Sequence, residues 1–214
     1  VVGSSGSGKS YTMADFFCQY LMRGAKIRVI DVGRSYKALS DVIGGQYIEF
    51  TEEADIRLNF FTNIQLNNEG DIHPDELQTI VPLIAMMANL SLSQEDVDNN
   101  IDITVIAGYI SKAVSMAFDA RERNAGMQDV IIALETIQRD SKSETGETNK
   151  IINDLIIALY PFGDPKGEYY KYFNGTSNLE FYSDFVVIEL EEIDSKDLLK
   201  SVVLAAISHK INTE

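Results

Sequence analysis

The sequence predicts an α/β fold with a mostly parallel central sheet, helices on the faces of that sheet and a small all-helical insertion. Three observations predict this fold. A glycine-rich run follows two β-branched residues at the start of the chain, strand patterns alternate with helix patterns, and the stretch 67–124 has no strand pattern. With 214 residues, 45% of them hydrophobic, the chain is long enough to build one such domain around a sizeable core.

The glycine-rich run covers residues 3–10 and reads GSSGSGKS, which matches G-x-x-x-x-G-K-[ST] at every fixed position. This pattern is typical of the phosphate-binding loop, or P-loop, of nucleotidases. Glycines let backbone N–H groups turn inward around phosphate oxygens, Lys9 reaches the β and γ phosphates, and the Ser10 hydroxyl is a ligand for Mg²⁺. The sequence therefore predicts a site for ATP and Mg²⁺. Its predicted residues are Gly3, Ser4, Ser5, Gly6, Ser7, Gly8, Lys9, Ser10 and Tyr11.

A flexible Gly/Ser linker has a similar composition, but the neighbouring residues favour the P-loop. Val1 and Val2 are strand formers, and a helix pattern follows, with apolar residues three and four positions apart over 13–21. A buried parallel strand usually has about five residues. Because only two precede this loop, we expect the chain to be a piece of a longer protein.

The rest of the chain is predicted to contain strands over 26–30, 46–50 and 185–190, with 57–61 also extended. Helices are predicted over 36–42, 75–90, 103–117, 129–139 and 150–160, and a last one from an N-cap at Ser195 to 207. We expect the first part of the nucleotidase core over 1–66, a helical insertion over 67–124, and the continued core over 125–214, incomplete at both ends.

Charge and cysteine content limit the possible functions. The formal net charge of −15 argues against a main nucleic-acid-binding surface, because neutralising phosphates requires clustered Lys and Arg. Direct DNA contact through a small basic region remains open. Cys18 is the single cysteine, so no intramolecular disulfide is possible, and a reducing cytoplasm is the expected compartment. No apolar run reaches the roughly 20 residues that span a bilayer.

Two acidic residues are candidates for the catalytic edge of the sheet. Asp31 ends the strand predicted after the first helix, so it lies where ligands bind in open parallel sheets and is a candidate to orient water or support Mg²⁺. The alternative is a turn-forming Asp before Gly33. Glu189 follows the apolar run 185–188 in the place of the acidic strand end that a P-loop ATPase needs, although an Asp is expected there. The alternative is a plain strand end, and spacing alone does not separate the two.

Arg34, three residues after Asp31, is a candidate to touch phosphate or a neighbouring subunit, and a surface salt bridge is the alternative.

Several blocks together resemble the conjugative-transfer ATPases of type IV secretion systems, in the TraC-like branch. The blocks are GSSGSGKS, IDVGRSY, RLNFF, YPFGDPKGEYYKYFNG and FVVIELEEIDSKDLLKSVVLAAI, spread from Val1 to about Ile207. The resemblance implies a RecA-like P-loop NTPase domain, assembly as a hexamer with itself, other secretion components as partners, and a place at the cytoplasmic face of the bacterial inner membrane. It also places the acidic pair of the family beyond Glu214, which favours Glu189 as the end of an earlier strand.

From these observations we expect an ATP-hydrolysing motor domain that energises conjugative DNA transfer or type IV secretion. With its acidic pair outside the chain, the isolated fragment would bind nucleotide weakly and turn it over hardly at all. The alternatives are a DNA-translocating ATPase of the FtsK/HerA-like kind, and a nucleotide-gated assembly platform with little turnover.

Overall fold

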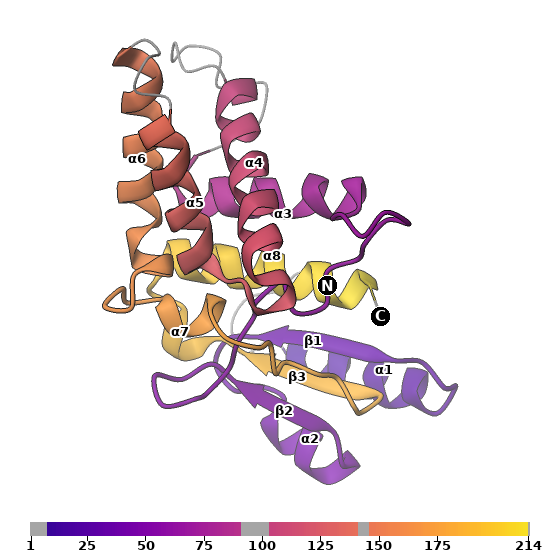
Figure 1. Cartoon of the computed structure of the whole chain (residues 1–214). Helices are drawn as coiled ribbons and strands as arrows, with labels where there is room; N and C mark the ends of the chain where they lie inside the picture. Colours follow the sequence, from indigo (N-terminus) through magenta and orange to yellow (C-terminus); the bar gives the residue numbers. More distant parts are fainter. Residues whose placement is uncertain (1–7, 91–102, 141–145, 214) are drawn as a thin grey trace. The chain divides into compact units, whose positions relative to one another are not determined.

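The computed structural model describes residues 8–90, 103–140 and 146–213. They form two compact units, one made of 1–54 with 180–200 and the other of 55–179 with 201–214 (Figure 1). The last helix, α8 (Asp197–Thr213), contributes to both, since the division falls between Lys200 and Ser201. Among the described residues, no helix is both long and apolar enough to cross a membrane.

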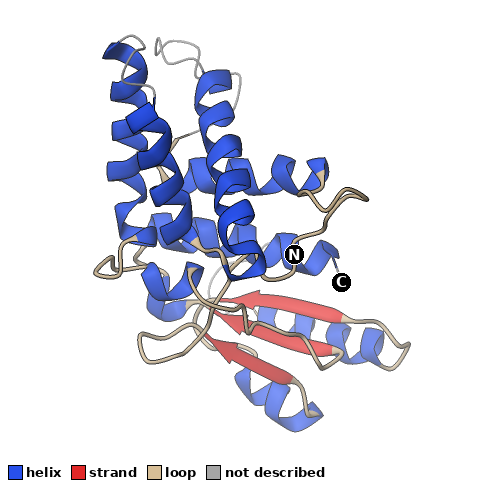
Figure 2. Cartoon of the chain, viewed as in Figure 1, coloured by secondary structure: helices blue, strands red, loops and turns tan. Residues whose placement is uncertain are grey.

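The first unit is built on a three-stranded parallel sheet in the order β1-β3-β2 (Figure 2). Its strands are β1 (Ile27–Asp31), β2 (Gln46–Glu49) and β3 (Phe185–Glu189). β3 comes from the far end of the sequence and pairs in parallel with both neighbours, so that Val187 lies between Val29 and Tyr47. The predicted parallel sheet is therefore confirmed for the described strands.

Helices α1 (Lys9–Leu21) and α2 (Lys37–Ile43) supply the apolar side chains that cover one face of this sheet. Phe17 and Leu21 of α1 and Leu39 of α2 pack against Val29, Phe185 and Val187. These three strand residues lie on one face because alternate residues of a strand point to the same side. A 3₁₀ turn, Glu191–Ile193, follows β3 and leads toward α8.

The second unit is helical. It contains α3 (Pro74–Met87), α4 (Ile103–Arg121), the 3₁₀ turn Glu122–Asn124, α5 (Met127–Asp140), α6 (Gly146–Gly163) and α7 (Tyr170–Phe173). α5 packs against both α4 and α6. The start of α3 follows the rules for helix N-termini, with the His73 side chain as N-cap, proline at the first position, and Asp75 and Glu76 in the first turn.

Two buried asparagines join the loops of this helical unit. The Asn59 side chain donates to the carbonyls of Ala125 and Gly175, and its Oδ1 accepts from the N–H of Phe61. The Asn174 side chain likewise donates to the carbonyls of Phe162 and Tyr170. Each of these buried amide side chains therefore holds several backbone groups through hydrogen bonds, in keeping with the rule that buried polar groups are hydrogen-bonded.

Most of the predicted elements are present, with differences at their ends. Residues 57–61 are not a strand: 57–59 have no regular structure and a turn begins at Phe60, since the Asn59 side chain bonds the carbonyls of Ala125 and Gly175 rather than lying along a strand ladder. α6 continues past Pro161 to Gly163, because the N–H groups of Asp164 and Tyr169 bond the carbonyls of Tyr160 and Pro161 at its end. α8 begins at Asp197 rather than directly after Ser195, since the 3₁₀ turn Glu191–Ile193 is followed by a further turn in which the N–H of Lys196 donates to the Ile193 carbonyl.

The domain boundaries proposed from the sequence stay a prediction. The described residues of 67–124 are helical apart from turns and one isolated bridge between Leu66 and Ile72, and they share a compact unit with α5 and α6.

Gly45 lies so close to β3 that adding a side chain at this position should lower the stability of the fold. A Cβ at Gly45 would lie 2.8 Å from the Phe185 ring and 2.9 Å from the Phe185 carbonyl oxygen. Because backbone cannot move aside cheaply, we expect Gly45→Ala to destabilise the fold by about 1–3 kcal/mol. Thermal denaturation followed by circular dichroism measures this, at roughly 2–4 °C per kcal/mol for a chain of this size.

The matched control for this prediction is Gly108→Ala in α4, where an added Cβ meets nothing within 4 Å. Alanine is the better helix former, so this variant should be neutral or slightly stabilising. Equal melting temperatures for Gly45→Ala and the wild type would contradict the close contact.

Candidate nucleotide site at the carboxyl edge of the sheet

The start of α1 has the local structure of an anion site. Gly8 is the N-cap residue with φ of 79°, a left-handed conformation that favours glycine, and it makes no side-chain cap. The first turn of α1 contains no acidic residue. Ser10 is exposed, and so is Tyr11, with 84% of its surface accessible. The positive end of the helix dipole and its first N–H groups are thus not neutralised by a side-chain cap or an acid.

These features fit the phosphates and the metal that the sequence pattern implies. Backbone N–H groups at an uncapped helix start bind phosphate oxygens, and an exposed Ser10 hydroxyl suits Mg²⁺ held between the protein and those phosphates. Of the residues predicted to bind nucleotide, Gly8, Lys9, Ser10 and Tyr11 are among the described ones. Gly3, Ser4, Ser5, Gly6 and Ser7 lie outside them.

The carboxyl ends of the three strands present a row of acidic residues. Asp31 of β1 is in register with Glu189 of β3, and Glu189 is in register with Glu49 of β2. Residues in register on neighbouring parallel strands point to the same face. The row therefore lies on the face that carries Val29, Val187 and Tyr47, which is the face covered by α1 and α2.

Glu189 is fully buried, and its carboxylate accepts hydrogen bonds from four donors. Oε1 accepts from the N–H of Gly33 at 3.2 Å and from that of Glu191 at 2.9 Å. Oε2 accepts from the N–H of Arg34 at 2.7 Å and from the Tyr47 hydroxyl at 3.2 Å. Hydrogen bonds to the charged form compensate for the loss of water around a buried carboxylate.

The other two acids of the row contact the same loop. Asp31 is buried, and its carboxylate accepts from the N–H of Tyr36 at 3.2 Å, where α2 begins. Glu49 accepts from Nε of Arg34 at 2.8 Å. All three carboxylates of the row are therefore hydrogen-bonded to the segment 33–36.

Arg34 is surrounded by carboxylates. Besides Glu49, its guanidinium pairs with Glu191 at 3.1 Å and with Glu192 at 3.6 Å. The hydrogen bond with Glu49, followed by the charge of Glu191, raises the pKa of Arg34 above its ordinary value. Its side chain is 44% exposed, so each pair contributes little to stability. In this structure Arg34 thus makes the salt bridges that the sequence left as one of two alternatives.

Aromatic packing connects α1 with this loop. The ring of Phe17 lies edge-on to the ring of Tyr36 with centroids 5.3 Å apart, and it also contacts Phe185 at 5.8 Å. α1 joins β1 through a short turn and packs along it through Phe17 and Leu21 (Figure 1). The helix therefore runs back along the strand, and its first residues lie toward the carboxyl edge of the sheet.

The structure thus brings the two predicted acids, Asp31 and Glu189, to neighbouring strand ends. Sequence reasoning did not single out Glu49 or Tyr47. Glu49 could have been predicted from the sequence, since it is the next-to-last residue of the strand predicted over 46–50, and acids at the carboxyl ends of parallel strands meet at one edge. The Tyr47 hydroxyl bond depends on the register of β2 with β3, for which the sequence carries no signal.

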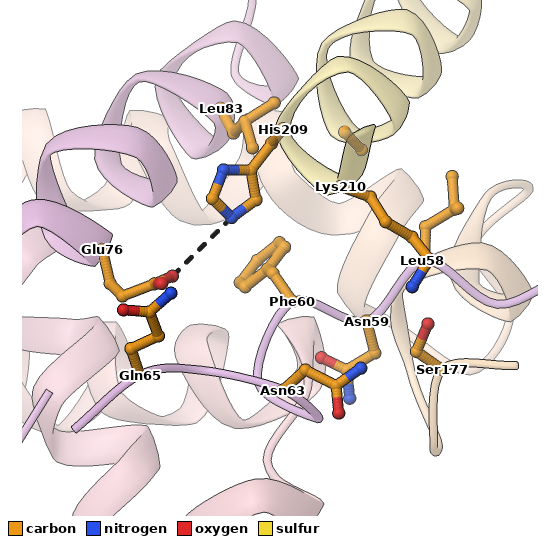
Figure 3. Close-up of a pocket in the computed structure, with 11 residues that line it drawn as sticks. Leu58, Asn59, Phe60, Asn63, Gln65, Glu76, Leu83, Ser177, His209 and Lys210 are labelled. Carbon is orange, nitrogen blue, oxygen red and sulfur yellow. Dashed lines mark ion pairs between the residues drawn. The ribbon is translucent and has the colours of Figure 1, made fainter. Parts of the chain in front are cut away.

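A separate pocket of about 300 Å³ lies wholly within the helical unit (Figure 3). Its wall carries Glu76 of α3 and His209 of α8, whose Oε2 and Nε2 are 3.7 Å apart, with Phe60 and Lys210 close by. Of the residues predicted to bind nucleotide, none of those that the structure describes lines this pocket.

The parallel sheet, the P-loop pattern and the open start of α1 define this chain as a P-loop NTPase fold. The chain belongs to the family described as the TraG P-loop domain, whose model matches residues 1–212. It is 26% identical over 206 residues to the protein TraC of Escherichia coli K12, a match that covers 95% of this chain and 22% of TraC. The sequence resemblance to conjugative-transfer ATPases is thereby confirmed.

A solved structure supports the fold independently. The structure of VirB4 of Thermoanaerobacter pseudethanolicus superposes with a TM-score of 0.72 at 15% sequence identity, covering 99% of this chain and 56% of that one. The chain thus spans about a fifth of the length of TraC and just over half of the VirB4 chain.

The partly buried hydrogen bond from the Tyr47 hydroxyl to Glu189 predicts a dependence of stability on alkaline pH. Burial, followed by the charge of Glu189, raises the pKa of the Tyr47 hydroxyl far above its ordinary value near 10. Above about pH 10 the unfolded chain would ionise Tyr47 while the folded chain would not, so the stability from this contact is complete below that pH and lost as pH rises. Tyr47→Phe should therefore cost about 1 kcal/mol at pH 7, and the difference from wild type should shrink above about pH 10.

Urea unfolding at pH 7, 9 and 10.5 measures this difference. Phenylalanine keeps the ring that packs beside Lys37, so the comparison isolates the hydroxyl. A difference in unfolding free energy that stays constant across these pH values would contradict the assignment.

Proposed function

We propose that this chain is the nucleotide-binding motor domain of an ATPase that energises conjugative DNA transfer or type IV secretion. The observation that carries the proposal is the uncapped, acid-free start of α1 directly after a complete P-loop sequence. The family supports a nucleotide ligand, and the relatives support the secretion context. ATP with Mg²⁺ is the proposed ligand, since the loop has both the lysine and the hydroxyl that a metal-bound triphosphate needs.

In the proposed reaction, water attacks the γ-phosphoryl group in line with the leaving diphosphate. Lys9 stabilises the charge on the β and γ oxygens, and N–H groups of the loop and of the first turn of α1 hold the phosphate chain. Mg²⁺ supplies charge neutralisation when it is bound, and the Ser10 hydroxyl is its ligand from this chain. Asp31 is proposed to orient the attacking water from the carboxyl edge.

The assembly and location are proposals that rest on the same family. We propose that the domain acts as a hexamer with copies of itself, in contact with other secretion components, at the cytoplasmic face of the bacterial inner membrane. In this arrangement an arginine of a neighbouring subunit would add to the charge stabilisation at the γ phosphate.

Replacing Lys9 tests the proposed site. Lys9→Ala removes a cation from the phosphates but leaves the backbone N–H groups in place. Since a hydrogen bond to a charged group contributes about 1.5–3 kcal/mol, affinity for Mg·ATP should fall by about 10- to 100-fold. Isothermal titration calorimetry measures the affinity, and circular dichroism confirms that the fold survives.

The control is Lys26→Ala, which removes an exposed lysine of the same unit. It should bind nucleotide as the wild type does. Equal affinities for the wild type and Lys9→Ala would show that the loop is not the working site.

DNA separates the secretion motor from a translocating motor. With a net charge of −15, the chain has little with which to neutralise DNA phosphates. We expect ATP turnover by the longest natural form of the protein to change by less than about twofold when DNA is added at 50 mM salt. Stimulation that disappears as salt rises would instead favour the translocase, and nucleotide binding without turnover would favour the assembly platform.

A further inference from the structure

Glu189 is a buried carboxylate without a cationic partner. It has no accessible surface, and within the described part of the chain no Lys, Arg or His forms an ion pair with it. Three of its four donors are backbone N–H groups, from Gly33, Arg34 and Glu191. A charge is costly to bury, so this carboxylate must be held by the geometry of the backbone around it.

The loop that follows β1 is shaped around this carboxylate. Gly33 and Arg34 both have positive φ, 104° and 56°, and positive φ is uncommon for a residue with a side chain. The N–H groups of both residues point at the Glu189 carboxylate, and backbone N–H groups that converge in this way form an anion-binding concavity, as they do around phosphate in a P-loop. Here the group that fills the concavity belongs to the protein itself: it is the side chain of Glu189, from the central strand β3.

The carboxylate has no acceptor capacity left for a metal ion. Each of its two oxygens already accepts two hydrogen bonds, and an ionised carboxylate offers about four lone-pair sites. To coordinate Mg²⁺, Glu189 would have to release the Gly33 or Arg34 N–H groups and leave them buried without partners.

The loop held by Glu189 lies at the edge where the nucleotide site is proposed. Asp31, the proposed water-orienting residue, begins this loop, and its carboxylate bonds the N–H of Tyr36 at the other end. Tyr36 in turn packs against Phe17 of α1. A displaced loop would therefore move Asp31 and the packing of the P-loop helix together.

We propose that Glu189 is a positioning residue for nucleotide turnover, whose buried carboxylate fills the concavity of N–H groups at Gly33 and Arg34 and holds the loop 32–35 at the carboxyl edge of the sheet. This inference rests on the proposed function. It differs from a catalytic or metal-binding role, because Glu189 acts through the loop and touches neither nucleotide nor metal.

Glu189→Gln tests the proposal, because glutamine has the same shape but one acceptor oxygen in place of two. Hydrogen–deuterium exchange should speed up at the amides of Gly33 and Arg34 by at least about tenfold, the factor expected when a hydrogen bond to a charged acceptor is lost. Mn²⁺·ATP affinity, measured by electron paramagnetic resonance, should stay within about threefold of the wild type, since the P-loop is unchanged. Turnover per bound nucleotide, measured on the longest natural form of the protein, should fall by about tenfold or more, because small misplacements cost rate.

Two variants serve as controls. Glu53→Gln changes an exposed glutamate of the same unit and should match the wild type in all three measurements. Gly45→Ala lowers stability through packing against Phe185 without touching Glu189. It should raise exchange across the unit uniformly and leave turnover per bound nucleotide unchanged, which distinguishes positioning from general destabilisation.

Each other outcome overturns the proposal. Unchanged exchange at Gly33 and Arg34 in Glu189→Gln would show that the carboxylate does not hold the loop. Faster exchange with unchanged turnover per bound nucleotide would show that the loop position is irrelevant to the reaction. A loss of Mn²⁺·ATP affinity without faster exchange would make Glu189 a metal ligand. Failure of the proposed function is seen separately, as wild-type nucleotide affinity in Lys9→Ala.

Discussion

The insertion of β3 between β1 and β2 is the constraint on which the first unit depends. β1 and β2 are separated by 14 residues of the chain, yet among the described strands they do not pair with each other, and both pair with β3. β3 is buried along its whole length, so its run of Phe, Val and Ile pairs on both sides and packs on both faces. The register it imposes sets Asp31, Glu189 and Glu49 in one row and thereby determines the carboxyl edge.

Two groups of backbone N–H donors lie at that edge, and each can be satisfied by a negatively charged group. At the start of α1, the backbone N–H groups have no side-chain cap and no acidic residue in the first turn, which suits an external anion. In the loop after β1, the N–H groups of Gly33 and Arg34 face inward onto the carboxylate of Glu189. One group of N–H donors is open to a ligand, whereas the other is closed by the protein, and the closed one keeps the adjoining loop in place.

The motifs that make the family resemblance specific do not all belong to the nucleotide site. RLNFF and the end of YPFGDPKGEYYKYFNG lie in the helical unit, where Asn59 bonds the carbonyl of Gly175 and Asn174 bonds those of Phe162 and Tyr170. Their residue types are required because a buried amide can satisfy donors and acceptors from several loops at once. A distinctive sequence motif can therefore mark residues that hold loops together as readily as residues that take part in a reaction.

The sequence by itself determined what depends on local pattern: the P-loop, the alternation of strands and helices, the helical character of the described parts of 67–124, and the acids that end strands β1 and β3. These follow from backbone geometry and side-chain periodicity within a few residues. The tertiary structure alone decided which strand lies in the middle of the sheet, that the Asn59 side chain bonds the loops at Ala125 and Gly175, and what Glu189 contacts. Those depend on contacts between segments far apart in the chain, 66 residues for Asn59 and Ala125 and 156 for Gly33 and Glu189, and local spacing carries no information about such contacts.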